Sequence, residues 1–203
     1  DAISDLPEIS VENFKKENDL NEKEIIALLP GSREQEVEKM LSLMLSVRDS
    51  FKNYQFVIAG APSLPKEFYQ KFVDDDVHFV SNKTYDLLRC SKAALVTSGT
   101  ATLETALLNI PEIVCYRTST ISYEIGKRVV KNIKFISLVN LIMDREIVKE
   151  LIQKELNTEN LVNELQKILE GQKRDKMLEN YELLREKLGG KGASEHAAEI
   201  IVN

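Results

Sequence analysis

The sequence predicts an α/β fold, a Rossmann-like doubly wound parallel sheet followed by C-terminal helices. Short apolar runs alternate with helical patterns along most of the 203 residues, and the links between them are short. This alternation is typical of parallel strands joined by crossover helices that cover both faces of a sheet. Two apolar runs also end in turns, at 30–33 and 98–100, that open directly into helical patterns. In a doubly wound sheet, ligands bind beyond strand ends of this kind.

Six segments are expected to form strands. Residues 25–29 are a continuous apolar run bounded by Pro30-Gly31, which is typical of a buried strand. Residues 94–97 are short and apolar, end in β-branched Val96 and Thr97, and suit the middle of a parallel sheet. The other strands are expected at 55–60, 77–80, 112–116 and 135–138.

Helical patterns fill the intervals between these strands. We expect Ser32 to cap the first long helix, with Gln35 at the spacing of a capping box. Further helices are expected within 62–76 and at 85–91, 102–108 and 122–130. Beyond 138 the pattern is helical to the end, with breaks near Asn157, Gly171 and Gly189-Gly190.

Composition narrows the class of protein. With 43% hydrophobic residues and a net charge of −6, the chain is an ordinary globular protein and not a general nucleic-acid binder, which would need a basic surface. No apolar run has the length of a membrane span. Cys90 and Cys115 lie in apolar surroundings, which favours reduced core residues. His78 and His196 have no Cys or His neighbours at ligand spacing, so no metal site is predicted.

The turn at 98–100 is the first candidate binding element. Gly99 allows close approach to the backbone, and Ser98 and Thr100 are residues that cap helices. Free amides at a helix start favour an anion. Glu104 has Ala101 three residues before it, so it is free of a capping box and able to accept hydrogen bonds from ribose hydroxyls. The alternative is an ordinary turn with a surface glutamate.

Arg33, beside the turn at 30–33, is the second candidate. Its guanidinium offers paired donors suited to phosphate oxygens, and the alternative is an exposed arginine that pairs with Glu34 or Glu36. Because the first and fourth strands flank the reversal of strand order in a doubly wound sheet, we expect the two turns to face each other across one crevice. Neither turn is a P-loop or a Gly-x-Gly-x-x-Gly motif, and Val96 replaces the glycine of a hydrolase nucleophile elbow before Ser98.

A basic group follows the fifth predicted strand. It is either a solvated helix face or a patch that meets anionic lipid head groups. Its members are Lys127, Arg128, Lys131 and Lys134.

Four motifs in this order closely resemble the lipid-A-disaccharide synthase family, glycosyltransferases of the two-domain, metal-independent type called GT-B. The motifs are Leu28-Leu29-Pro30-Gly31-Ser32-Arg33-x-x-Glu36-Val37, Ser98-Gly99-Thr100-Ala101-x-x-Glu104, Pro111-x-x-Val114-x-Tyr116-Arg117 and Asn140-Leu141-Ile142. The resemblance runs from about residue 25 to the C-terminus and covers the nucleotide-sugar half of such an enzyme.

The resemblance implies roles for the candidate residues. Ser98, Gly99 and Thr100 would hold the diphosphate of a UDP-sugar and Glu104 its ribose, while Arg33, in a loop with Gly31 and Ser32, would meet phosphate. Asn140 would lie near the donor sugar. The family pattern has Pro and Gly where Val139 and Asp144 stand, which puts the shape of this loop in question.

The resemblance also implies a reaction and partners. The family transfers 2,3-diacylglucosamine from UDP to 2,3-diacylglucosamine 1-phosphate without a cofactor. We therefore expect UDP-2,3-diacylglucosamine as ligand, no nucleic acid, and a cytoplasmic protein; contact with the inner membrane's cytoplasmic face and a homodimer stay open. The chain opens with Asp1, and we expect it to be a piece of a longer enzyme, inactive alone because the acceptor half is missing.

Three segments are expected on this basis: an N-terminal linker at 1–24, a Rossmann-like UDP-sugar-binding domain at 25–170, and C-terminal helices at 171–203 that pack on or cross to a partner domain. Two alternatives remain at this point. One is a UDP-GlcNAc 2-epimerase-like or other GT-B enzyme domain, and the other is a free-standing nucleotide-binding module.

Overall fold

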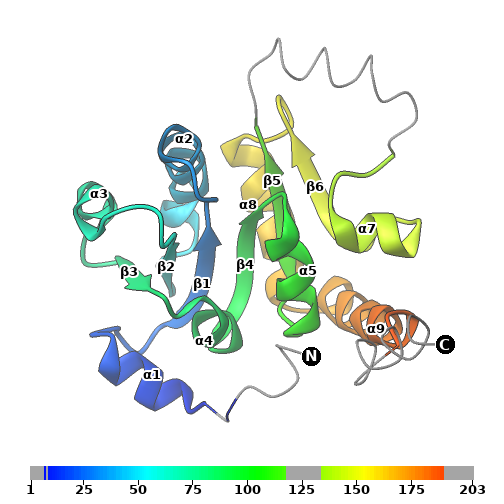
Figure 1. Ribbon diagram of the computed structural model, residues 1–203, viewed down its shortest axis with the longest axis horizontal. Helices are drawn as coiled ribbons and strands as arrows, with labels where there is room; N and C mark the ends of the chain where they lie inside the picture. Colours follow the sequence, from blue (N-terminus) through cyan, green and yellow to red (C-terminus); the bar gives the residue numbers. More distant parts are fainter. Residues whose placement is uncertain (1–6, 8, 118–133, 190–203) are drawn as a thin grey trace, which may run out of the picture.

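The computed structural model describes residues 7, 9–117 and 134–189, which form an α/β unit around one six-stranded sheet (Figure 1). All neighbouring strands pair in parallel, in the order β3-β2-β1-β4-β5-β6. The strands are β1 Glu24–Leu29, β2 Tyr54–Gly60, β3 Val77–Ser81, β4 Ser91–Thr97, β5 Glu112–Tyr116 and β6 Lys149–Ile152. The predicted doubly wound parallel sheet is therefore confirmed.

The strand order reverses between β1 and β4, which lie side by side at the centre of the sheet. Leu28 pairs with Leu95 and Leu29 with Val96, so the two strands end at nearly the same level. The turns that follow them consequently meet at one edge of the sheet, as the sequence predicts.

Helices cover both faces of the sheet. They are α1 Val11–Glu17, α2 Glu34–Leu45, α3 Lys66–Tyr69, α4 Thr84–Arg89, α5 Thr100–Leu107, α7 Leu138–Met143, α8 Thr158–Leu169 and α9 Gln172–Lys187, with short 3-10 turns at Arg48–Ser50 and Gln70–Phe72. Among the described residues, no helix combines the length and apolarity that a membrane crossing requires.

Alternate residues of the central strands enter two separate cores. Ile26 and Leu28 of β1 join the larger core with residues of α2, α8 and α9, whereas Ile25 and Ala27 join the smaller core with residues of α1 and α4. Both sets are almost completely buried. Strands buried on both faces are apolar without alternation, which explains why the runs at 25–29 and 94–97 are readable from the sequence.

The prediction is wrong at the sixth strand. Residues 135–138 do not form a strand; α7 begins at Leu138, and Ser137 caps it by accepting from the Asn140 amide. The sixth strand is β6, in a region predicted to be helical. It has four residues, two of them the charged Lys149 and Glu150, and within the described part of the chain it pairs only with β5. A short, charged edge strand lacks the apolar run by which a strand is recognised.

The last described helix, α9, packs into the larger core through Met177, Tyr181 and Leu184. Arg174 on the same helix donates to the carbonyl oxygens of Lys92 (2.7 Å) and Ile168 (3.2 Å). Residues of α9 thus contribute to the core of the domain before them. The helix predicted at 122–130 and the C-terminal segment after Gly189 lie outside the described residues.

Candidate functional site

A cavity of about 530 Å³ lies at the carboxyl ends of β1, β2 and β4. Figure 1 shows these strands pointing to the same edge of the sheet, with α2 and α5 following β1 and β4. The cavity is lined by Leu29, Gly31, Ser32, Arg33, Glu36, Ala59, Gly60, Ala61, Pro62, Thr84, Thr97, Ser98, Gly99, Thr100, Ala101 and Glu104. Seven of the eight binding residues predicted from the sequence are in this set.

The turn after β1 is shaped by Gly31, whose φ of +98° lies in a region that other residues rarely adopt. The predicted cap at Ser32 is wrong. Helix α2 begins at Glu34, its N-cap is Arg33, and no side chain caps it. Ser32 instead accepts at its carbonyl oxygen from the Ser63 hydroxyl (2.9 Å), which links this turn to the loop after β2. Among the described residues, the first amides of α2 therefore have no side-chain acceptor.

The turn after β4 also leaves helix amides free. Gly99 is the N-cap of α5, which has no side-chain cap and begins at Thr100, two residues earlier than predicted. A Cβ at Gly99 would meet nothing within 4 Å, so the turn faces open space. Ser98 does not cap the helix, because its hydroxyl donates to the Ile136 carbonyl (3.2 Å). The Thr102 amide donates to the Gly99 carbonyl oxygen (3.3 Å), whereas the Thr100 and Ala101 amides have no acceptor among the described residues. These free amides at the helix start are oriented to bind an anion.

The charges around the two helix starts differ. The first turn of α2 carries Glu34 and Glu36, whose negative charge opposes the binding of an anion there. The first turn of α5 has no acidic residue, so α5 offers the stronger anion site. Arg33 pairs with Glu36 at 3.3 Å, the alternative considered from the sequence, but its side chain is 82% exposed. Such exposed pairs are weak, so an anion in the cavity can compete for the guanidinium.

Glu104 lies one turn into α5, half-buried at the cavity wall. Its neighbour is Tyr85 on α4, which the sequence analysis did not identify. Burial raises the pKa of Tyr85, and the adjacent Glu104 carboxylate raises this pKa further. Glu104 therefore lies beside the anion site with a phenol next to it, in a position to accept hydrogen bonds from a ligand's hydroxyl groups.

Comparison with known proteins decides the family. A family model described as lipid-A-disaccharide synthetase matches residues 2–202. The chain belongs to this family. Lipid-A-disaccharide synthase from Syntrophus aciditrophicus is 38% identical over 182 residues, which cover 85% of this chain and 47% of that protein. The synthase from Persephonella marina is 35% identical over 203 residues, covering 94% and 53%. The chain thus spans about half the length of these synthases.

Solved structures share the fold. The S. aureus MnaA–UDP co-structure superimposes with a TM-score of 0.60 at 15% identity, covering 96% of this chain and 48% of that chain. Spinosyn rhamnosyltransferase SpnG, complexed with thymidine diphosphate, gives a TM-score of 0.60 at 11% identity, covering 90% and 46%. This member of the lipid-A-disaccharide synthetase family therefore shares its α/β fold with about half of each of these structures.

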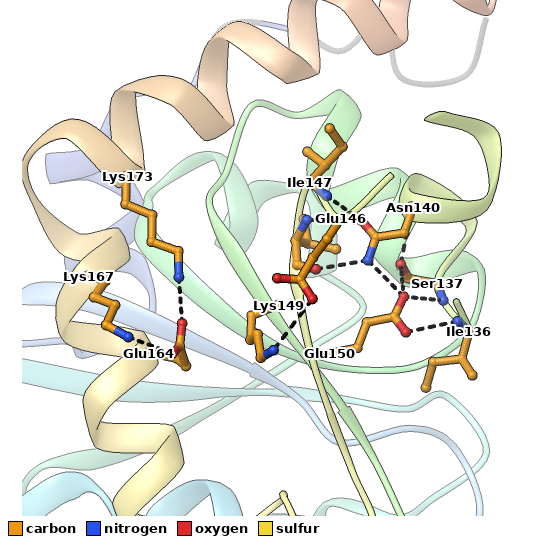
Figure 2. A network of polar contacts seen from close by, with 11 residues as sticks. Ile136, Ser137, Asn140, Glu146, Ile147, Lys149, Glu150, Glu164, Lys167 and Lys173 are labelled. Atoms are coloured by element: carbon orange, nitrogen blue, oxygen red, sulfur yellow. Dashed lines mark hydrogen bonds and ion pairs between the residues drawn. The ribbon is translucent and has the colours of Figure 1, made fainter. Parts of the chain in front are cut away.

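Asn140, the eighth predicted binding residue, does not line the cavity. It is fully buried, and its Oδ1 accepts from the amides of Ile147 (2.7 Å) and Val148 (3.0 Å). Its Nδ2 donates to the Val148 carbonyl (2.9 Å) and to Glu150 Oε1 (2.9 Å), as Figure 2 shows. The side chain has no capacity left for a sugar. Here it joins α7 to β6.

Other wall residues were not predicted from the sequence. A Cβ at Gly60 would lie 2.2 Å from the ring of Phe79, so only glycine fits against it. The Phe79 ring stacks on the Tyr69 ring, with the two ring centroids 4.6 Å apart. The Tyr69 hydroxyl accepts from the Ala61 amide (3.0 Å) at the cavity wall. Thr97 also lines the cavity, and its buried hydroxyl has no partner among the described residues. Of these features of the cavity wall, only the glycine at the end of a strand, Gly60, could be recognised from the sequence.

The predicted basic patch falls mostly outside the described residues. Lys134 is described and exposed. Lys127, Arg128 and Lys131 lie in the segment that the structure does not describe.

Proposed function

We propose that the chain is the UDP-sugar-binding half of a glycosyltransferase that transfers 2,3-diacylglucosamine from UDP to 2,3-diacylglucosamine 1-phosphate. The observation that carries the proposal is one cavity onto which two helix starts open without side-chain caps, with Arg33 at one and Glu104 beside the other. Membership of the lipid-A-disaccharide synthetase family supports this choice of donor and acceptor.

The proposed roles follow from the arrangement of donors. The first amides of α5 and the Arg33 guanidinium hold the diphosphate, and Glu104 accepts from the ribose hydroxyls. The diphosphate gains negative charge as it leaves the sugar, so fixed donors stabilise the transition state more than the ground state. Removing one such donor typically costs about 10²- to 10³-fold in rate.

The acyl chains of donor and acceptor place the reaction beside a membrane. The proposal therefore includes peripheral contact with the cytoplasmic face of the inner membrane, and binding of the acceptor by the half that the relatives carry in addition. A homodimer is compatible with it.

The chain is expected to bind UDP in the absence of a divalent metal, because helix amides and Arg33 supply the positive potential. Isothermal titration calorimetry with UDP in EDTA tests this, with uridine as the control ligand. UDP should bind more tightly than uridine, and added Mg²⁺ should change the affinity little. Binding that requires Mg²⁺, or equal affinities for UDP and uridine, would contradict the proposed site.

The two charged side chains are expected to respond differently. Glu104→Gln should weaken uridine and UDP alike by about 1.5–3 kcal/mol, because both ligands carry the ribose. Arg33→Ala should weaken UDP and spare uridine, which has no phosphate. Calorimetry on both variants with both ligands separates the roles. Glu34→Gln, on the same helix turn but absent from the cavity lining, is the control for removal of a carboxylate: it should weaken neither ligand, because the charge of Glu34 opposes anion binding. The same ligand pattern in both variants would show that the roles are wrongly assigned.

A further inference from the structure

Glu150 lies on the edge strand β6, and its buried carboxylate accepts four hydrogen bonds (Figure 2). Oε1 accepts from the Ser137 amide (2.9 Å), the Ser137 hydroxyl (2.7 Å) and Asn140 Nδ2 (2.9 Å). Oε2 accepts from the Ile136 amide (2.9 Å). One side chain of the strand thus holds Ile136 and Ser137, the two residues that precede α7.

This arrangement differs from an ordinary ion pair. In the described part of the chain no lysine or arginine forms an ion pair with Glu150, although its strand neighbour Lys149 pairs with Glu146 at 3.4 Å. Two of the four donors are backbone amides, which a carboxylate can bind only when the chain is held in one conformation. Removal of the carboxylate would leave these buried donors without an acceptor, which is costly.

The network reaches the anion site through Ile136. While the Ile136 amide donates to Glu150, its carbonyl oxygen accepts from the Ser98 hydroxyl (3.2 Å). Ser98 immediately precedes Gly99, the N-cap of α5. Helix α5 also packs against α7, the helix that the network anchors. A continuous path of hydrogen bonds therefore runs from β6 to the turn that presents the free amides of α5.

We infer that Glu150 is a positioning residue for the phosphate-binding turn: it fixes the Ile136 carbonyl, and this carbonyl fixes Ser98 and the amides beyond it. The inference rests on the proposed function for the identity of the anion, the diphosphate of UDP. Sequence reasoning did not assign Glu150 any role, because its donors come from residues 10 to 14 positions earlier and its effect acts on a turn more than 50 positions away.

Glu150→Gln is the direct test, because it keeps the size of the side chain but replaces an acceptor oxygen with an NH₂ group that faces N–H donors. UDP affinity should fall about tenfold, the effect of losing well-placed hydrogen bonds to a charged ligand. Uridine affinity should stay within about twofold, because Glu104 lies farther along α5, where Thr105 and Ala106 are buried in the domain. The changed ratio of the two affinities is a readout that a general loss of stability would not give.

Glu112→Gln is the matched control. Glu112 is a buried glutamate on the neighbouring strand β5, and neither of its carboxylate oxygens has a partner among the described residues. The substitution is chemically the same but touches no path to the turn. UDP and uridine affinities should both stay unchanged.

The Ser98→Ala variant tests the path itself. It removes the hydroxyl that donates to the Ile136 carbonyl, and it should lower UDP affinity about tenfold, as Glu150→Gln does. Because the two residues act in series, the double variant Glu150→Gln/Ser98→Ala should bind UDP no more weakly than the weaker single variant. Additive losses, an unchanged UDP-to-uridine ratio in Glu150→Gln, or equal losses for both ligands would each overturn the inference.

Failure of the proposed function is a separate outcome, since the unsubstituted chain would then bind no UDP in the same titrations.

If Glu150→Gln does not fold, as judged by circular dichroism, the Ser137→Ala variant tests the inference instead. It removes one donor to Glu150 together with the side-chain cap of α7, and leaves the two backbone donors in place. A UDP affinity about threefold lower with uridine unchanged supports the inference, and unchanged UDP affinity overturns it.

Discussion

The 203-residue chain alone is expected to bind UDP but to form no detectable disaccharide from UDP-2,3-diacylglucosamine and 2,3-diacylglucosamine 1-phosphate. Transfer needs an acceptor hydroxyl held at near-attack distance and a base that takes its proton. Positioning of this kind contributes about 7–11 kcal/mol, so its loss removes at least five orders of magnitude, roughly, in rate.

The described residues around the cavity support this expectation. Glu36 accepts from Arg33, and Glu104 lies beside Tyr85 in the position proposed for ribose. Among the described residues no histidine lines the cavity; His78 lies on β3 and lines a different one. His196 lies outside the described residues.

The measurement is product formation by the purified chain, with and without the unmatched half of a curated relative expressed separately. Turnover should appear only in the mixture, and should fall by about 10²-fold or more when the mixture contains Arg33→Ala. This variant ties any restored activity to the cavity described here. Turnover by the chain alone, retained through purification and lost in Arg33→Ala, would show that the catalytic groups lie within these residues.

The central part of the fold could be predicted because it is locally encoded. Strands β1 and β4 are buried on both faces along most of their length, so each contains an unbroken apolar run that is visible in the sequence. The turns after them contain Gly31 and Gly99, which mark the strand ends. The rule that ligands bind where strand order reverses then brings the two turns together, and the pairing of β1 with β4 confirms that step.

The parts that were not predicted depend on contacts between distant residues. Glu150 reads as a helix-favouring charged residue, yet it is buried in a strand because four donors satisfy it. Ser32 has the spacing of a capping box, but its carbonyl is held by Ser63, and α2 begins later. Tyr85 lies beside Glu104 only because α4 and α5 flank the same edge of the sheet. No local pattern carries this information.

Glu112 gives the last prediction, which concerns stability. This residue of β5 is fully buried, and neither carboxylate oxygen has a partner among the described residues. Burial raises its pKa well above the ordinary range, so the folded chain keeps a proton that the unfolded chain releases. The stability linked to this proton is fully present below the ordinary pKa, about 4.3, and is lost as pH rises toward the raised folded pKa.

Glu112→Met is therefore expected to stabilise the chain at pH 8 by more than at pH 5. At pH 5 the gain is about 2 kcal/mol, because a buried polar group without a partner is replaced by an apolar one of similar size. Between the ordinary pKa and the raised folded pKa, the unsubstituted chain loses as much as about 1.4 kcal/mol of stability per pH unit, because its folded state retains one proton. The gain from Glu112→Met grows by the same amount. Urea unfolding at both pH values measures the difference. Glu150→Gln is the control, since it breaks a satisfied network and should destabilise by about 1–3 kcal/mol. Parallel pH profiles for the unsubstituted chain and Glu112→Met would mean that Glu112 titrates normally, and hence that its carboxylate is hydrated or paired in solution.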